Sequence, residues 1–239
     1  MSSFFSDMEI EELAEGLMRQ YLGQQRDIPL RVDIEGFLTG YLGLPLKYRS
    51  FAEDDFSKIG FISDGITPLR IMDRHRPIRE VFPKGTVVLE KCLQKRGEEG
   101  RKRFTVAHEA GHYIMDRTVT MASFHREYDS ERAYSSQELK ELLSFRENRV
   151  DRLAAALLMP RFMVHEVLKR FDVSERIAIY GNNLLRLEDK LLVQKMAGVM
   201  GVSYTAFCIR LKELDLLERH DISEYIAHEI GLGSEVAVL

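Results

Sequence analysis

The most informative segment of the sequence is Arg103-Phe104-Thr105-Val106-Ala107-His108-Glu109-Ala110-Gly111-His112. It places an H-E-x-x-H motif inside a helix predicted over residues 101–116. Residues four apart on a helix lie about 40° apart around its axis, so His108 and His112 project from one face. Glu109 lies about 100° round from His108, where its carboxylate can reach a water beside a metal. The motif therefore indicates a metal site with Glu109 as general base, and the alternative is two surface histidines flanking a glutamate.

A glycine stands inside the same predicted helix. Gly111 costs about 1 kcal/mol relative to alanine at such a position. We therefore expect close packing or the approach of a ligand to require it.

A catalytic zinc ion generally takes three protein ligands and a water, so a third ligand must follow His112. Downstream residues with suitable chemistry are His125, Glu127, Asp129, Glu131, Glu138, Glu141, Glu147 and Asp151. Glu147 and Asp151 differ from the rest because they stand four apart beside the apolar stripe of a predicted long helix. If Glu147 bound the metal, Asp151 could accept the second ring N–H of a ligand histidine. The alternative is that nearby arginines neutralise both carboxylates as surface pairs, namely Arg146, Arg149 and Arg152.

The sequence before the motif predicts two helices and a small sheet. Apolar residues at helical spacing mark the helices at residues 8–21 and 32–42. Short apolar runs mark strands at residues 44–48, 59–63, 66–72 and 86–89. Asp64-Gly65 between two of these runs predicts a hairpin turn.

The sequence after the motif predicts mainly helices. The polar stretch 117–133 indicates a long loop or a lid. A capping-box pattern at residues 135–138 starts a helix that Pro160 stops, and a further helix runs to Phe171. Residues 172–239 again show helical spacing, with breaks at Gly181 and Gly201. The predicted fold is α+β: a small mixed β-sheet packed with helices including the H-E-x-x-H helix in residues 1–171, then an all-helical region in residues 172–239.

Together these features resemble the ImmA/IrrE family of metallopeptidases. The resemblance spans about residues 28–171 and rests on the motif helix, on Glu147-x-x-x-Asp151 and on a final Ala154-Ala155-Ala156-Leu157-Leu158-Met159-Pro160. It implies a gluzincin-like, zincin-type fold and a zinc ion held by His108, His112 and Glu147. The Glu-x-x-x-Asp spacing is also similar to that of thermolysin-like enzymes, which implies that Asp151 supports a ligand histidine. The long charged stretch between His112 and Glu147 does not match family positions.

The resemblance implies a zinc-dependent endopeptidase. In such chemistry zinc lowers the pKa of its water and polarises the scissile carbonyl, while Glu109 takes the proton and passes it to the leaving amine. His125, Tyr128 and Tyr134 are open candidates to stabilise the oxyanion. The family further implies an antirepressor that cuts an Xre-type helix-turn-helix repressor. An extended substrate segment is expected to add as a strand to an exposed sheet edge, with residues 86–89 the suggested edge.

Composition narrows the remaining function classes. The first thirty residues lack the pattern of a secretion signal and no apolar run suits a membrane span, which predicts a cytoplasmic protein. Cys92 and Cys208 are far apart, which excludes a cysteine-rich metal site. The net charge of -4 argues against general attraction to nucleic acid, so such a partner needs a local patch.

The C-terminal region predicts a helix-turn-helix-like pair, with Gly201 in the turn and residues 204–214 as the second helix. Residues 175–239 hold seven Lys/Arg and ten Asp/Glu, a difference of -3, so direct DNA binding there is not expected. A helical packing or protein-docking module is the expected role. A transcriptional regulator and a catalytically silent interaction protein remain the alternatives to the peptidase.

Overall fold

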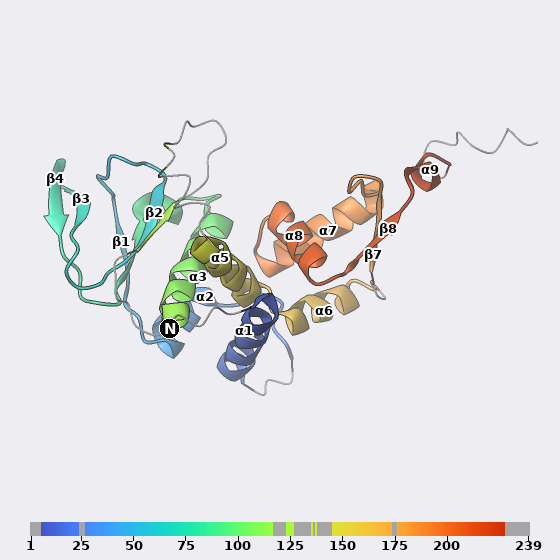
Figure 1. Cartoon of the computed structure of the whole chain (residues 1–239), viewed down its shortest axis with the longest axis horizontal. Coiled ribbons are helices and arrows are strands. Elements are labelled where there is room, and N and C mark those ends of the chain that lie inside the picture. The colour runs from blue at the N-terminus through green and yellow to red at the C-terminus, as the bar shows by residue number, and fades with distance from the viewer. Residues whose placement is uncertain are drawn as a thin grey trace, which may run out of the picture. The chain divides into compact units, whose positions relative to one another are not determined.

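The computed structural model describes residues 6–23, 27–116, 123–126, 135, 137, 145–173 and 176–227 (Figure 1). The chain divides into two compact units. The first comprises Met1–Asp27 and Val32–Pro160, and the second comprises Ile28–Arg31 and Arg161–Leu239. The division at Pro160 comes earlier than the predicted boundary at residue 171, so that the helix after Pro160 belongs to the second unit.

The helices predicted at residues 8–21, 32–42 and 101–116 are present in the first unit, the helix predicted from about residue 135 to Pro160 is described from residue 145 onward, and a 3-10 helix at residues 91–94 was not predicted. The helices of this unit are α1 (Asp7–Leu22), α2 (Ile34–Gly36), the π-helix η1 (Phe37–Tyr41), the 3-10 helix η2 (Lys91–Gln94), α3 (Glu99–Asp116) and α5 (Phe145–Leu158). A capping box between Ser6 and Glu9 opens α1. The capping box predicted at residues 135–138 falls mostly outside the described residues.

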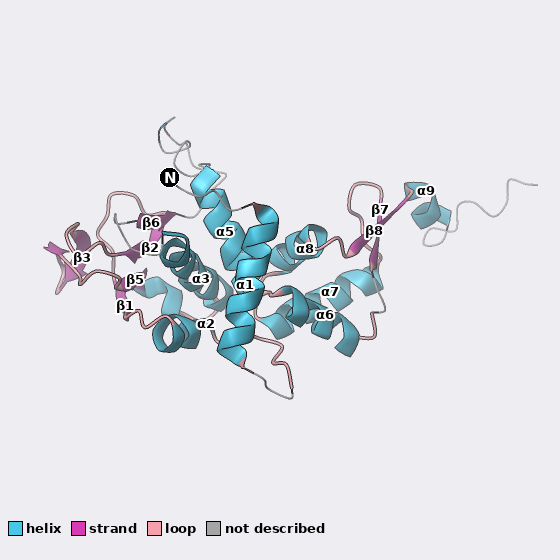
Figure 2. Cartoon of the chain, turned by 60° about the horizontal axis from the view of Figure 1, so that its bottom comes forward, coloured by secondary structure: helices cyan, strands magenta, loops and turns pink. Residues whose placement is uncertain are grey.

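A four-stranded mixed sheet carries the site-bearing helix. Its strands are β1 (Leu46–Arg49), β5 (Val87–Glu90), β2 (Lys58–Ile62) and β6 (Ser123–Arg126), in that order. β1 runs parallel to β5, and the other pairs are antiparallel. Helix α3 packs against β2, β5 and β6 and, on its other side, against α5 (Figures 1 and 2). The motif helix is therefore held between the sheet and α5.

The hairpin lies elsewhere than predicted. Strand β3 (Leu69–Asp73) pairs with β4 (Arg76–Glu80), and the turn between them is Arg74-His75, both at positive φ. The prediction of a hairpin at Asp64-Gly65 was wrong, because the Asp64 carboxylate accepts hydrogen bonds from the next backbone N–H groups and leads the chain away from β2. Strand β4 escaped prediction because it is largely exposed and lacks an apolar run.

The second unit is not all-helical as predicted. Its elements are α6 (Arg161–Arg170), β7 (Ile177–Tyr180), α7 (Leu187–Met200), α8 (Tyr204–Glu213), β8 (Leu217–His220) and α9 (Ile222–Tyr225). Strands β7 and β8 pair in parallel. Four-residue runs are too short for periodicity to separate a strand from a helix, which explains the error. The predicted breaks are present, since Gly181 and Gly201 both have positive φ and Gly201 caps the C-terminal end of α7.

Helices α7 and α8 meet at an angle of 98° across the short link Gly201-Val202-Ser203. Ser203 caps α8 by accepting a hydrogen bond from the N–H of Ala206. In the described part of the chain, no single helix is long and apolar enough to cross a membrane, although this bent pair reaches the required length and hydropathy together.

Candidate metal centre

The motif side chains lie in the interior of the first unit. His108, Glu109 and His112 are 1%, 0% and 2% exposed. They occupy the stretch of α3 that is covered by the sheet and by α5. Burial of three polar side chains so close together is costly unless they satisfy one another or a ligand, which excludes the alternative of two surface histidines.

Three atoms from two helices converge at this place. The Nε2 atoms of His108 and His112 are 3.0 Å apart, and the Glu147 Oε2 atom of α5 lies 3.3 and 3.4 Å from them. Two ligands of a tetrahedral zinc ion at about 2.0–2.1 Å from the metal are about 3.3–3.4 Å apart. The donor set and its spacing therefore fit a divalent metal such as zinc.

Asp151 stands behind the cluster. Its Oδ1 atom lies 2.7 Å from Nδ1 of His108, on the far side of the ring from Nε2. A carboxylate there selects the tautomer with the proton on Nδ1 and leaves the Nε2 lone pair for a metal. The alternative of surface pairs is not supported for Arg152, which donates to Asp7 of α1 instead.

The electrostatics of the cluster favour a bound cation. Burial lowers the pKa of His108, but hydrogen bonds to Asp151 and Glu147 and the nearby charge of Glu109 outweigh it and raise the pKa to about 9. Burial raises the pKa of Glu147, whereas hydrogen bonds to His108 and His112 hold that pKa well below its usual range. Three carboxylates thus surround two imidazoles, and a divalent cation would balance their charge.

Close approach of α3 and α5 brings Glu147 and Asp151 to the histidines. A Cβ on Gly111 would lie 3.1 Å from Cγ1 and 3.4 Å from the carbonyl oxygen of Val150. The glycine predicted to serve close packing therefore does so, at the point where the two site helices cross.

We predict that Gly111→Val lowers the free energy of unfolding by about 1–3 kcal/mol, because the added methyl groups force α3 and α5 apart. The matched control is Gly16→Val on α1, where a Cβ meets nothing within 4 Å. That change should alter stability by less than about 0.5 kcal/mol. Chemical denaturation measures the free energy of unfolding of both variants. Equal values for the two variants would show that a side chain is tolerated where α3 crosses α5.

Other predicted candidates cannot be placed in the centre. His125 belongs to β6, of which only the backbone is described. Glu127, Tyr128, Asp129, Glu131, Tyr134, Glu138 and Glu141 lie outside the described residues. Strand β6 was not predicted, because it spans only four residues and lies within residues 117–133, whose polar composition is typical of a loop. The alternation in Ser123-Phe124-His125-Arg126 was the only available signal.

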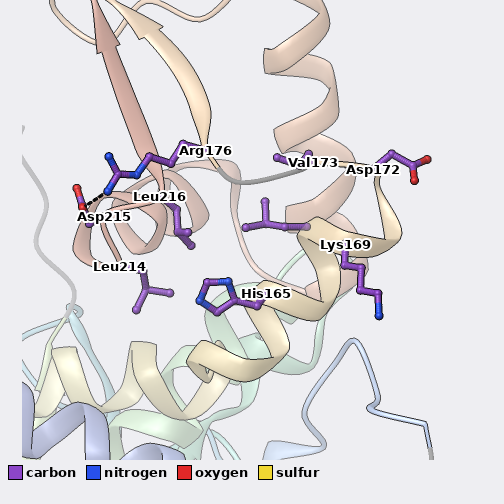
Figure 3. Close-up of a pocket in the computed structure, with 9 residues that line it drawn as sticks. His165, Lys169, Asp172, Val173, Arg176, Leu214, Asp215 and Leu216 are labelled. Carbon is purple, nitrogen blue, oxygen red and sulfur yellow. Dashed lines mark hydrogen bonds and ion pairs between the residues drawn. The ribbon is translucent and has the colours of Figure 1, made fainter.

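A separate cavity lies in the second unit. It has a volume of about 760 Å³ and is lined by residues of α6 and of the segment after α8 (Figure 3). Leu168, Leu214 and Leu216 contribute apolar side chains, and Arg176 forms an ion pair with Asp215. None of the predicted site residues lines this cavity, so it is not part of the candidate metal centre.

Comparison with known protein families gives a match. The family model Peptidase_M78, described as an IrrE N-terminal-like domain, matches residues 87–212, which is more than half of the chain. The matched range begins at β5 and includes α3, α5 and the residues of the metal centre. No curated protein matched the chain in the corresponding comparison.

Proposed function

The chain belongs to the Peptidase_M78 family of metallopeptidases, and we propose on this premise that it is a zinc-dependent endopeptidase acting on a specific protein. The observation that carries the proposal is the convergence of His108, His112 and Glu147 beside the buried Glu109. A structural cluster of histidines would not need three ligand atoms at the spacing of a zinc site together with a buried carboxylate on the same helix.

His108, His112 and Glu147 would hold the ion. Zinc supplies a Lewis acid that lowers the pKa of water and polarises a carbonyl group. Glu109 accepts a proton from the attacking water as its oxygen bonds to the scissile carbonyl carbon. Glu109 then donates that proton to the amide nitrogen as the C–N bond breaks, so that an acid and an amine are released. Asp151 keeps the proton of His108 on Nδ1 throughout.

The substrate strand needs a different edge from the one predicted. Residues 87–90 form β5, which pairs with β1 on one side and β2 on the other, so no backbone edge remains there. Among the described strands of this sheet, β1 and β6 are the edges, and β6 packs against α3. We therefore place an extended substrate segment along β6, where its scissile peptide would lie flat beside the motif helix.

A helix-turn-helix repressor is the proposed substrate. The resemblance of the motif helix and of Glu147-x-x-x-Asp151 to ImmA/IrrE peptidases supports it, and so does the need for a locally unfolded segment that can add to β6. We propose that the repressor is cut in the cytoplasm, with no membrane partner.

The second unit is proposed as a protein-docking region. The 98° angle between α7 and α8 falls within the range of helix-turn-helix pairs. The acidic excess of residues 175–239 favours a role in contacting protein over a role in contacting DNA phosphates.

Incubation of the purified chain with repressors encoded beside it tests the proposed function. We expect defined fragments by mass spectrometry, their disappearance with a zinc chelator and their return when zinc is added back. Cleavage that persists after exhaustive chelation would refute a metal-dependent mechanism.

Asp151→Ala is predicted to weaken zinc affinity or the cleavage rate by roughly ten- to a hundredfold while the fold is retained. The reason is that Asp151 orients His108 without binding the ion itself. Competition with a chromogenic chelator measures the affinity, and Asp151→Asn, which keeps a hydrogen-bond acceptor, should recover part of the loss. If Asp151→Ala left both affinity and rate unchanged, the 2.7 Å contact would have no functional role.

A further inference from the structure

The β3–β4 hairpin of the first unit is a local basic patch in an acidic chain. Residues 69–80 contain four arginines and one histidine against two acidic residues, and they contain no lysine. The chain as a whole carries a net charge of -4. This local positive charge lies on a two-stranded element, the β3–β4 hairpin, whose place in the fold is shown in Figure 1.

One face of the hairpin is anchored and the other is presented to solvent. Leu69 and Ile71 are buried in a cluster with Phe61, Phe82 and Val88. Side chains alternate along a strand, so Arg70 of β3 and Arg79 of β4 point to the opposite face. The outward face therefore carries Arg70 and Arg79, whereas Arg76 stands opposite Asp73 on the other face, next to the turn, where its side chain is also exposed.

Two of the arginines repel each other in the folded hairpin. Arg70 and Arg79 stand directly opposite each other in the register, and like charges in that position destabilise a sheet. Arg70 is partly compensated by an ion pair with Asp54. Within the described residues, Arg74, Arg76 and Arg79 are all exposed and form no ion pair. An external anion would compensate them.

The turn between β3 and β4 has a backbone conformation that glycine adopts with less strain than residues that carry a side chain. Arg74 and His75 have φ of 43° and 72°, and a two-residue turn of this type strongly favours Asn-Gly. The hairpin thus carries an arginine and a histidine at its tip in place of the turn residues that would strain it least.

We propose that the β3–β4 hairpin binds duplex DNA through its phosphates. The guanidinium fork matches two phosphate oxygens, and a two-stranded ribbon fits the major groove of B-DNA. A protein partner would require a desolvated apolar centre. The exposed Met72 and Ile78 do not form one, because the register puts them on opposite faces of the hairpin.

Binding by so small a patch is weak and strongly dependent on salt. Each phosphate contact contributes about 0.9 to the slope of log affinity against log salt concentration. Three contacts give a slope of about -2.7, or roughly 40-fold weaker binding when salt rises from about 50 mM to about 200 mM.

The test is fluorescence anisotropy of the full chain with a labelled DNA duplex over this salt range. The triple variant Arg74→Gln, Arg76→Gln and Arg79→Gln should lose about 2.7 from the slope and bind tens of times more weakly at low salt. The matched control removes the same charge from exposed positions of α7 and α8, with Lys190→Gln, Lys195→Gln and Lys212→Gln. That control should retain the wild-type slope.

A second variant separates binding from stability. Arg74→Asn with His75→Gly supplies the favoured turn, so its midpoint of thermal unfolding should rise while its salt slope falls by about 0.9. A purely structural hairpin would gain stability without any change in DNA binding.

Three outcomes would overturn the proposal. Loss of binding in the lysine control with none in the arginine variant would assign DNA contact to α7 and α8. Arginine-dependent binding of polyglutamate but not of DNA would indicate an acidic protein partner. Equal arginine-dependent competition by duplex RNA would exclude the major groove as the docking surface, because the A-form groove is too narrow for side chains to read.

Discussion

Replacing Glu109 with glutamine should leave the zinc content and the fold unchanged while cleavage of the repressor falls by about 10²–10⁴-fold. Glu109 is fully buried on α3, the helix that carries the proposed ligands His108 and His112, and glutamine preserves its shape. An amide cannot accept the proton of the attacking water, so binding and bond breaking would separate. The rate constant is measured by single-turnover cleavage followed by gel or mass spectrometry.

Substrate affinity is the control for this prediction. The Glu109→Gln variant should bind an uncleaved repressor as tightly as wild type does before cleavage, because its binding surface is intact. Retention of a wild-type rate by a variant with full zinc content would remove Glu109 from the mechanism and leave the proton acceptor unidentified.

Replacing either His112 or Glu147 with alanine should reduce the zinc content from about one ion per chain to nearly none. Each residue supplies one of three convergent atoms, and two remaining ligands hold zinc far less tightly. The protein should also become less stable in the presence of zinc, because the ion no longer favours the folded state. Elemental analysis after gel filtration gives the stoichiometry.

His165→Ala and Glu166→Ala on α6 are matched controls for the loss of an imidazole and a carboxylate. His165 is exposed, and Glu166 pairs with Arg170 outside the cluster. Both controls should keep stoichiometric zinc. Full zinc content in both His112→Ala and Glu147→Ala would mean that the ion binds elsewhere.

The motif helix and its partners were predictable because their geometry is local. Spacing of four residues puts His108 and His112 on one face of α3, and the same spacing puts Glu147 and Asp151 on one face of α5. Local spacing alone could not decide whether Glu147 binds a metal or pairs with arginines at the surface. Its position beside the two imidazoles depends on how α3 crosses α5 at Gly111, which is a property of tertiary packing.

Strand pairing was less predictable because it joins distant segments. The sheet order β1-β5-β2-β6 puts residues 87–90 in the interior of the sheet and pairs β6 with β2, and local patterns do not specify which strands become neighbours. Strand β4 is mostly exposed and has Ile78 as its one large apolar side chain, so the alternating hydrophobic pattern that reveals strands is missing. The parallel pairing of β7 with β8 likewise depends on the helices between them.

X-ray absorption at the zinc edge of the purified chain measures the coordination of the metal itself. We expect one zinc ion per chain with two imidazole nitrogens and oxygen ligands at about 2.0–2.2 Å, from His108, His112, Glu147 and water. A scattering shell of sulfur at about 2.3 Å, or a single imidazole, would contradict it.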